Sequence, residues 1–425
     1  MNLISFTRLR IAIIVALMLA ACAAPPVPTP TMAPTMAAPT IAPEPTAPPT
    51  PTPLPAPTTN LTDECLTSVT AGVDYFPAKA SLTQTNGFSV EYHDTYKVLT
   101  VNTPTPGATD ALTYVLVQCG TEAPAGFEPA QIISVPVKRV VAMSTTYLTV
   151  LDDLGLLDRL VGVDDATYTY NQKVVDLVTA GKIKAIGSGA TLNVEAAIEL
   201  QPELIITYGS GSADFDSHPK LLEAGLKVVL NAEWLDTSPL GRAEWGKFIA
   251  LFFNEEAAAE DWFTAIADRY AQVKEIAAKA GSTPKLAYGT PYQGTWYLPG
   301  GASFAAQLIR DAGATYPYAT DTSTASLPLS FEEAYSTTRD AAHWINLPFV
   351  TDLAALVAQD SRFAEFDAYK NGAVWNNDLR SNAAGGSDYY ESAVVRPDLV
   401  LADLVAIVHP DKLPDHKFYY YRQLK

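Results

Sequence analysis

The sequence predicts an α/β protein with two Rossmann-like lobes, one long helix that joins them and a small antiparallel β extension before them. Three observations predict this fold class. From about residue 137, short apolar segments alternate with helical ones, which favours parallel sheets covered by helices. Residues 255–280 hold strong helix formers without Gly or Pro, which predicts one long helix. Residues 60–126 alternate apolar and polar side chains with the period of a strand.

The composition limits the possible functions. The 425 residues suffice for two or three domains, and a hydrophobic fraction of 48% supports complete cores. A formal net charge of −18 argues against nucleic-acid binding, because a phosphate backbone requires clustered Lys and Arg. The acidity is compatible with a soluble surface that docks on basic partners.

The beginning of the chain has the pattern of a secretory leader. Two arginines precede an apolar run that ends in small residues directly before Cys22, which predicts a signal peptide over residues 1–21. A Cys at this point resembles the lipobox of bacterial lipoproteins. The resemblance implies lipidation of Cys22, a lipid anchor in the cell membrane and an extracytoplasmic location, in the periplasm or on the outer surface. Residues 22–59, rich in Pro and Thr, predict an extended, lipidated linker.

The β extension is expected over residues 60–126. Three strand-like runs at 88–92, 96–101 and 112–118 predict a small antiparallel meander. With Cys22 assigned to the lipid, Cys65 and Cys119 remain. Outside the cytoplasm such a pair favours a disulfide, which would join the start of the extension to the end of its third strand.

The lobes and the helix between them follow in order. The N-terminal lobe is predicted over residues 127–253 and the C-terminal lobe over residues 282–425. Residues 254–281 are the linking helix, which follows a break near Asn254 and ends at Gly281 as a C-cap. The strands predicted for the N-terminal lobe are 137–143, 160–163, 204–207 and 228–230.

Four short motifs occur along the lobes in a fixed order. They are Asn193-Val194-Glu195 with the run 200–206, Gly300-Gly301-Ala302-Ser303-Phe304, Leu329-Ser330-Phe331-Glu332-Glu333, and Asn371-Gly372-Ala373-Val374-Trp375. This order resembles the helical-backbone (class III) periplasmic binding proteins of ABC importers for ferric siderophores, haem and cobalamin. The resemblance covers about residues 130–412.

The resemblance implies a function and a set of partners. It implies a monomeric substrate-binding protein that captures a metal chelate and delivers it to an ABC permease and its ATPase. A ferric siderophore is the first expectation, cobalamin or another corrinoid the second and haem the third. No cofactor is expected. The resemblance also implies that Glu195 and Glu332, one in each lobe, dock on arginines of the permease. The alternative is that both carboxylates only complement helix dipoles.

The expected ligand site lies beyond the carboxyl ends of the strands, where open α/β sheets bind ligands. Large aromatics with a few polar groups at these ends suit a ligand with apolar surface. Residues 385–390 are expected to close its mouth. The alternative for each Tyr and Trp is a packing role, and for Arg242 an exposed salt bridge. The predicted ligand-binding residues are Ser144, Thr145, Thr146, Tyr147, Asp165, Ser188, Tyr208, Glu233, Trp234, Arg242, Tyr288, Trp296, Trp344, Asn376, Arg380 and Tyr389.

Two other classes of function are alternatives to transport. The five His are scattered without an i,i+4 pair, so no protein-bound metal is expected. An extracytoplasmic hydrolase is one alternative, but no G-x-S-x-G or H-E-x-x-H motif occurs, so the chain is predicted not to be an enzyme. A surface adhesion or structural lipoprotein that uses residues 60–126 is the other alternative.

Overall fold

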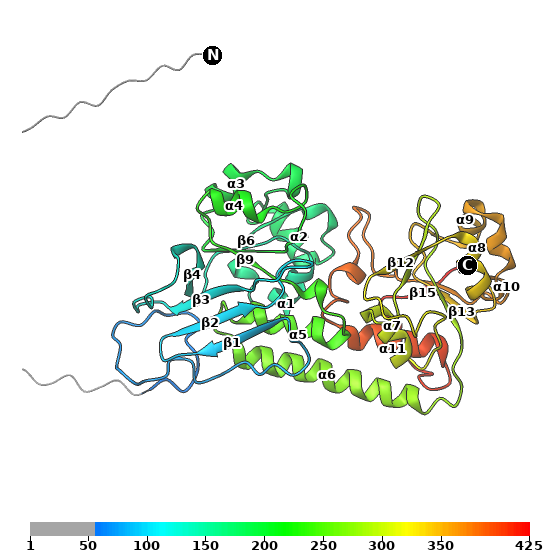
Figure 1. Cartoon of the computed structure of the whole chain (residues 1–425), viewed down its shortest axis with the longest axis horizontal. Helices are drawn as coiled ribbons and strands as arrows, with labels where there is room; N and C mark the ends of the chain where they lie inside the picture. Colours follow the sequence, from blue (N-terminus) through cyan, green and yellow to red (C-terminus); the bar gives the residue numbers. More distant parts are fainter. Residues whose placement is uncertain (1–55) are drawn as a thin grey trace, which may run out of the picture. The chain divides into compact units, whose positions relative to one another are not determined.

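The computed structural model describes residues 56–425 (Figure 1). The predicted signal peptide, Cys22 and most of the 22–59 linker lie outside the described residues. Within residues 56–425, none of the helices has the length and apolar character needed to cross a membrane.

The β extension is a four-stranded sheet. Strands β1 (Phe88–Tyr92), β2 (Tyr96–Val101) and β3 (Leu112–Gln118) form the predicted antiparallel meander. A fourth strand, β4 (Ile132–Val135), pairs in parallel with β3 and was not predicted. The sequence of these four residues shows little periodicity. They form a strand because they pair with the edge of β3.

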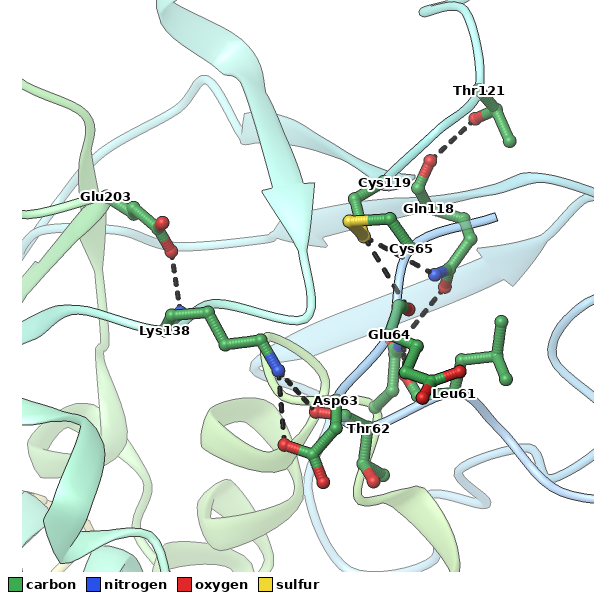
Figure 2. Close-up of a disulfide and its surroundings, with 11 residues drawn as sticks. Leu61, Thr62, Asp63, Glu64, Cys65, Gln118, Cys119, Thr121, Lys138 and Glu203 are labelled. Carbon is green, nitrogen blue, oxygen red and sulfur yellow. Dashed lines mark hydrogen bonds and ion pairs between the residues drawn. A yellow bond between two sulfur atoms is a disulfide. The ribbon is translucent and has the colours of Figure 1, made fainter. Parts of the chain in front are cut away.

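A disulfide closes the start of the extension. Cys65 and Cys119 are joined, with their Cα atoms 4.8 Å apart, as Figure 2 shows. Nearby, Lys138 donates from its ammonium group to the carbonyl of Thr62 at 3.0 Å and to Asp63 at 3.2 Å. The first described residues are therefore held both to β3 and to the segment that leads into the first parallel sheet.

The N-terminal lobe contains a five-stranded parallel sheet in the order β7-β6-β5-β8-β9. Alternate residues of its central strand enter different cores, since Val140 and Ala142 pack on one face and Val141 on the other. Helices therefore cover both faces, as the sequence predicts. The elements are β5 (Val140–Ala142), α1 (Thr146–Asp153), β6 (Leu160–Val163), α2 (Gln172–Thr179), β7 (Lys184–Ala185), α3 (Val194–Glu199), β8 (Leu204–Thr207), α4 (His218–Glu223) and β9 (Val228–Leu230).

Two helices lead from the first lobe to the second. Helix α5 (Pro239–Ala250) is followed by a turn in which Asn254 has a φ of 60°, and then by α6 (Glu256–Ala278). Helix α6 has 23 residues and runs along both halves of the structure (Figure 1). Arg269 of α6 pairs with the buried Asp398 at 2.8 Å, which ties this helix to the C-terminal lobe.

The C-terminal lobe is less regular than the first. Its four-stranded sheet has the order β10-β13-β14-β15, in which only β15 is antiparallel, and a separate β11–β12 pair lies beside it. The strands β11, β12 and β15 were not predicted, because each is short and takes its register from a distant partner. The elements are β10 (Leu286–Tyr288), β11 (Trp296–Pro299), α7 (Phe304–Asp311), β12 (Ser326–Leu329), α8 (Phe331–Thr338), β13 (His343–Ile345), α9 (Leu353–Gln359), α10 (Asp367–Lys370), β14 (Val374–Asn376), α11 (Pro397–Val408) and β15 (Arg422–Gln423).

The β extension shares a core with the N-terminal lobe. Phe88 of β1 packs on Trp245 of α5, with ring centroids 4.8 Å apart, inside one cluster that also holds Val140. A buried ion pair adds to this contact: Lys97 Nζ lies 2.7 Å from Glu256 Oε1, and both side chains are fully buried. Lys97 also donates to the carbonyl of Leu251 at 2.6 Å. The extension is thus fixed to the beginning of α6.

Candidate ligand-binding site

The loop after β5 and the turn after β9 meet at the carboxyl edge of the first sheet. Ser144 Oγ and Thr146 Oγ1 lie 2.9 Å apart. Thr146 Oγ1 donates to Oε1 of Glu233 at 3.0 Å, although the two residues are 87 positions apart. These hydroxyls and this carboxylate come together because neighbouring parallel strands end at the same edge.

Glu233 is an acid held away from water. Its residue is 6% exposed, and its Oε2 atom has no hydrogen-bond partner. The hydroxyl of the buried Tyr147 has no partner either, and both groups line a cavity of about 10 Å³, here called the Glu233 cavity. Burial raises the pKa of Glu233, and it raises the pKa of Tyr147 well above its ordinary value with a further contribution from Glu233.

Other acids lie along the same edge. Burial raises the pKa of Asp164, and the charge of Asp165 raises it further. The pKa of Tyr208 is raised by burial first and then by Asp164 and Asp216. The carboxyl edge of the first sheet is therefore rich in carboxylates and phenols.

Three residues of this edge that were predicted to bind ligand take part in local hydrogen bonds. Asp165 accepts from the backbone N–H of Thr167 at 2.8 Å and caps a short turn. Ser188 forms a capping box with Thr191. Trp234 is partly exposed, and its carbonyl accepts a hydrogen bond from Arg242 at 2.6 Å.

A pocket of about 380 Å³, here called the aromatic pocket, lies at the carboxyl ends of β10 and β13. Four aromatic side chains that line it are strongly exposed, and Phe349 is 84% exposed. Exposed aromatics gathered on one surface are typical of a binding site. The pocket is lined by Tyr288, Gly289, Thr290, Tyr292, Tyr297, Asn346, Pro348, Phe349 and Tyr390.

A second pocket of about 170 Å³, here called the apolar pocket, shares Tyr288 and Tyr390 with the first and also includes Tyr389. Arg242 of α5 lines it, and its guanidinium carbon lies 3.7 Å from the ring centroid of Phe304 in α7. Arg242 also lines the Glu233 cavity. Arg242 therefore lies between the Glu233 cavity of the first lobe and the apolar pocket.

Residues 380–391, here called the strap, cross from the C-terminal to the N-terminal lobe. Asn382 Nδ2 donates to the carbonyl of Thr169 at 2.9 Å. Thr145 Oγ1 donates to the carbonyl of Tyr390 at 3.5 Å. A polar cavity of about 510 Å³ is lined by residues of the strap, Asn382 among them, and by groups of both lobes. The strap thus brings Tyr390 to the pocket while it holds the first lobe.

The structure corrects the prediction for three residues. Trp296 and Trp344 are fully buried in the core of the second lobe, with ring centroids 6.0 Å apart, and they line neither the aromatic nor the apolar pocket. The indole of Trp344 donates to the carbonyl of Gly289 at 2.7 Å and supports the pocket from within. Asn376 is also buried, and its side chain bonds the backbone of Leu347 at 3.0 Å. These three residues lie within the strands β11, β13 and β14 and do not follow them. Side chains along a strand alternate in direction, and these three point into the core.

Arg380 was predicted to face the ligand and instead lies on the polar cavity. It forms an ion pair with Asp388 and stacks 4.2 Å from the ring centroid of Tyr419. Sequence reasoning missed Phe349 and Glu391. Phe349 lies in a loop and has a φ of 62°. No pattern in the neighbouring sequence predicts that its side chain is exposed.

Glu195 and Glu332 are both exposed in the first turn of a helix. Asn193 caps the first of these helices and Ser330 the second. Glu332 Oε1 lies 3.4 Å from Arg362 Nη1. Among residues 56–425, no three His, Cys, Asp or Glu side chains are grouped so that they could hold a metal ion.

Comparisons with known proteins give one family match and several proteins of similar fold. Residues 140–378 match the family model described as periplasmic binding protein. An uncharacterized lipoprotein of Methanocaldococcus jannaschii is 26% identical over 300 residues, which cover 68% of this chain and 70% of that protein. A periplasmic heme binding protein from Pseudomonas aeruginosa aligns with a TM-score of 0.50 and 19% identity, over 64% of this chain and 93% of that one. The molybdate periplasmic binding protein of Haemophilus influenzae aligns with a TM-score of 0.51 and 16% identity, over 66% and 89%. At these identities the likeness to the two solved structures shows the fold.

Proposed function

This chain belongs to the periplasmic binding protein family, and we propose that it captures a metal chelate between its two lobes and delivers it to an ABC permease and its ATPase. A ferric siderophore is the first ligand we propose, with a corrinoid or haem as alternatives. The observation that carries the proposal is the aromatic pocket at the carboxyl ends of β10 and β13, which faces solvent through Phe349 and Tyr390.

The dimensions of the pockets support a ligand of this kind. The aromatic and apolar pockets, of about 380 and 170 Å³, share two walls, and sites for small molecules usually measure 300–1,000 Å³. A bare metal ion would gain little from aromatic walls, whereas the organic shell of a chelate presents apolar surface to them.

The mechanism follows from how the lobes are joined. Helix α6 and the strap connect the two lobes at separate places, so we expect only a small closure when the ligand binds. Glu195 and Glu332, one exposed on each lobe, would then dock on arginines of the permease. The distance between these two carboxylates depends on how far the lobes have closed, so the permease could distinguish the closed protein from the open one.

The anchor is proposed from the beginning of the sequence. The curated relatives that match this chain are lipoproteins. Lipid on Cys22 would place the binding lobes outside the cytoplasm, with the Pro- and Thr-rich linker between membrane and lobes.

Ligand capture by the full-length lipoprotein tests the proposal. The protein is purified in detergent, and its melting temperature is measured with ferric siderophores, corrinoids and haem. A ligand that binds only the native state raises the melting temperature, by an amount set by RT ln(1 + [L]/Kd). Absorbance and mass spectrometry of molecules that co-purify identify the natural ligand.

We expect one class of chelate to raise the melting temperature in a saturable way. If no chelate does so and nothing co-purifies, the proposal is wrong. The Phe349→Ala variant is the matched control, because a rise that depends on the aromatic pocket must shrink when this exposed ring is removed.

A further inference from the structure

The chain enters the folded part at the amino edge of the first parallel sheet. Asp63 forms ion pairs with Lys138, at 3.2 Å, and with Arg159. Lys138 lies two residues before β5, and Arg159 lies directly before β6, which pairs in parallel with β5. Ser144 and Glu233 follow strands of this sheet and lie at its opposite edge. The entry point is therefore at the edge opposite to the carboxyl ends of the strands.

Residues 60–65, here called the tether root, also lie beside the beginning of α6. Asn60 Nδ2 donates to Glu256 Oε2 at 2.7 Å, and Asn254 Nδ2 donates to the carbonyl of Leu61 at 2.7 Å. The disulfide at the end of the tether root joins it to the residue that follows β3 (Figure 2). These contacts fix the tether root to the side of the protein on which α6 runs.

The helix that carries Glu195 covers the other face of the first sheet. Ala197 of α3 packs in the same core as Val141 of β5. Val140 and Ala142 point the other way, into the core that holds the β extension and α5. Helix α6 packs on α5. The sheet therefore lies between Glu195 and the side on which α6 and the tether root are found (Figure 1).

The second lobe has the same arrangement. Leu286 of β10 packs in the core to which α6 contributes Tyr270, whereas the next residue, Ala287, packs in the core to which α8 contributes Ala334. Successive side chains of a strand point to opposite faces of a sheet, so α6 and α8 cover opposite faces. Glu332, in the first turn of α8, thus lies away from α6 (Figure 1). The surface that carries Glu195 and Glu332 is here called the docking face.

The size of the folded part sets how far a tether must reach. A compact body of about 370 residues, the size of residues 56–425, is roughly 55 Å across, and a path around half of it measures roughly 85 Å. Between Cys22 and Asn60 lie 37 residues rich in Pro and Thr. A polyproline II chain of that length reaches about 115 Å. The linker is therefore long enough to pass from the tether root around the folded part, with little to spare.

We propose that delivery depends on the length of the linker: with lipid on Cys22, the docking face reaches a permease in the same membrane only if the linker spans the folded part. The inference rests on the proposed function and adds a requirement to its docking step. A linker shorter than about 18 residues reaches less than the roughly 55 Å across the folded part. It would hold the docking face away from the membrane, and the effective concentration of that face at the permease would fall toward zero.

Energy transfer to the membrane tests the geometry without ligand or permease. The full-length lipoprotein is bound to phosphatidylcholine vesicles that contain an acceptor-labelled lipid, and a donor is attached at Glu199→Cys on α3 or at Asp261→Cys on α6, both exposed positions. Deletion of residues 26–49 leaves 13 residues between Cys22 and Asn60. We expect this deletion to lower transfer from the α3 label strongly and to leave transfer from the α6 label, which lies beside the tether root, undiminished.

Stimulation of the transporter tests the consequence. The lipoprotein, loaded in turn with a ferric trihydroxamate, cyanocobalamin and haemin, is added to the cognate transporter in proteoliposomes or in detergent. In proteoliposomes the deletion should reduce ATPase stimulation about tenfold or more, because the short linker does not span the distance between the sites. In detergent no bilayer restricts the approach, so both linkers should stimulate equally. The control carries residues 26–49 in scrambled order and should behave as the wild type, since length and composition are kept.

Three results would overturn the inference. They are equal transfer from the α3 label with both linkers, wild-type stimulation by the deletion variant in proteoliposomes, and a loss of stimulation by that variant in detergent as well. Each would leave the proposed capture and delivery of chelates in place. Failure of the wild type to stimulate the transporter with any of the three probes would instead contradict the proposed function, while the energy transfer decides the geometry separately.

Discussion

The Oε2 atom of Glu391 accepts a hydrogen bond from the backbone N–H of Tyr170 at 2.7 Å, across 221 residues of chain. Its Oε1 atom accepts a second bond from the N–H of Asn171 at 3.0 Å. One carboxylate of the C-terminal lobe thus holds two backbone donors of the N-terminal lobe. The adjacent Tyr390 lines the aromatic pocket. Consecutive residues of the strap therefore contact the pocket and the opposite lobe.

This contact should depend on pH. Burial raises the pKa of Glu391 to about 7, more than the two backbone N–H donors lower it, and Asp388 and Asp152 raise it further. Lys173, Arg380 and Arg396 face the same polar cavity. A folded-state pKa above the ordinary 4.5 means that the folded chain holds this proton more tightly than the unfolded chain. The stabilisation that results from this tighter proton binding is complete below about pH 4.5 and is lost as the pH rises through about 7.

The measurement is urea unfolding of the wild type and Glu391→Gln between about pH 5 and pH 8. We expect the stability of the wild type relative to the variant to fall by about 1–3 kcal/mol over this range. The lowered pKa values of His218 and His343, both caused first by burial, are common to the two proteins and cancel in the difference. A difference that stays flat or rises with pH would contradict this account.

Phe349→Ala should weaken ligand binding without destabilising the fold. The side chain is 84% exposed, so its removal leaves no cavity in the core. Loss of an aromatic contact surface should reduce the affinity roughly tenfold. Titration measures the affinity and thermal unfolding the stability. Leu222→Ala on α4 is the control, because Leu222 is 41% exposed and lines neither pocket. Equal effects of both variants on binding would show that the aromatic pocket is not the site.

Lys97→Met should destabilise the protein by about 3–5 kcal/mol, because it leaves the carboxylate of Glu256 buried without its cation. The double variant Lys97→Met/Glu256→Met should recover much of this loss, since an apolar pair of similar size replaces both charges. Denaturant unfolding with the ligand absent gives both values. A double variant less stable than Lys97→Met would show that the other donors to Glu256, such as Asn60 at 2.7 Å, need its charge.

Glu195→Lys and Glu332→Lys should each impair docking on the permease while ligand affinity stays unchanged. Both residues are exposed and lie outside the pockets, so charge reversal there acts on a partner and not on the ligand. The readout is stimulation of the ATPase activity of the cognate transporter in proteoliposomes, with a loss of about tenfold expected. Glu199→Lys in α3 is the control. If it reduces stimulation as strongly as Glu195→Lys, net charge and not a specific contact explains the effect.

The sequence by itself determined the local elements. The period of two in Phe88–Tyr92 and Tyr96–Val101 predicts the strands that the structure contains. The run of helix formers after Asn254 predicts α6, which begins at Glu256. These strands and this helix depend on residues that are close together in the chain, so one sequence is enough to predict them.

Only the tertiary structure decided which side chains face the site. Trp296 and Trp344 follow the same kind of pattern as Tyr288, yet they fill the core while Tyr288 lines both pockets. No residue near Glu391 in the sequence predicts that its carboxylate accepts a hydrogen bond from the backbone N–H of Tyr170. The direction of a side chain at a strand end, and a contact between segments two hundred residues apart, are set by how the lobes pack. The packing of the lobes cannot be predicted from the periodicity of short segments.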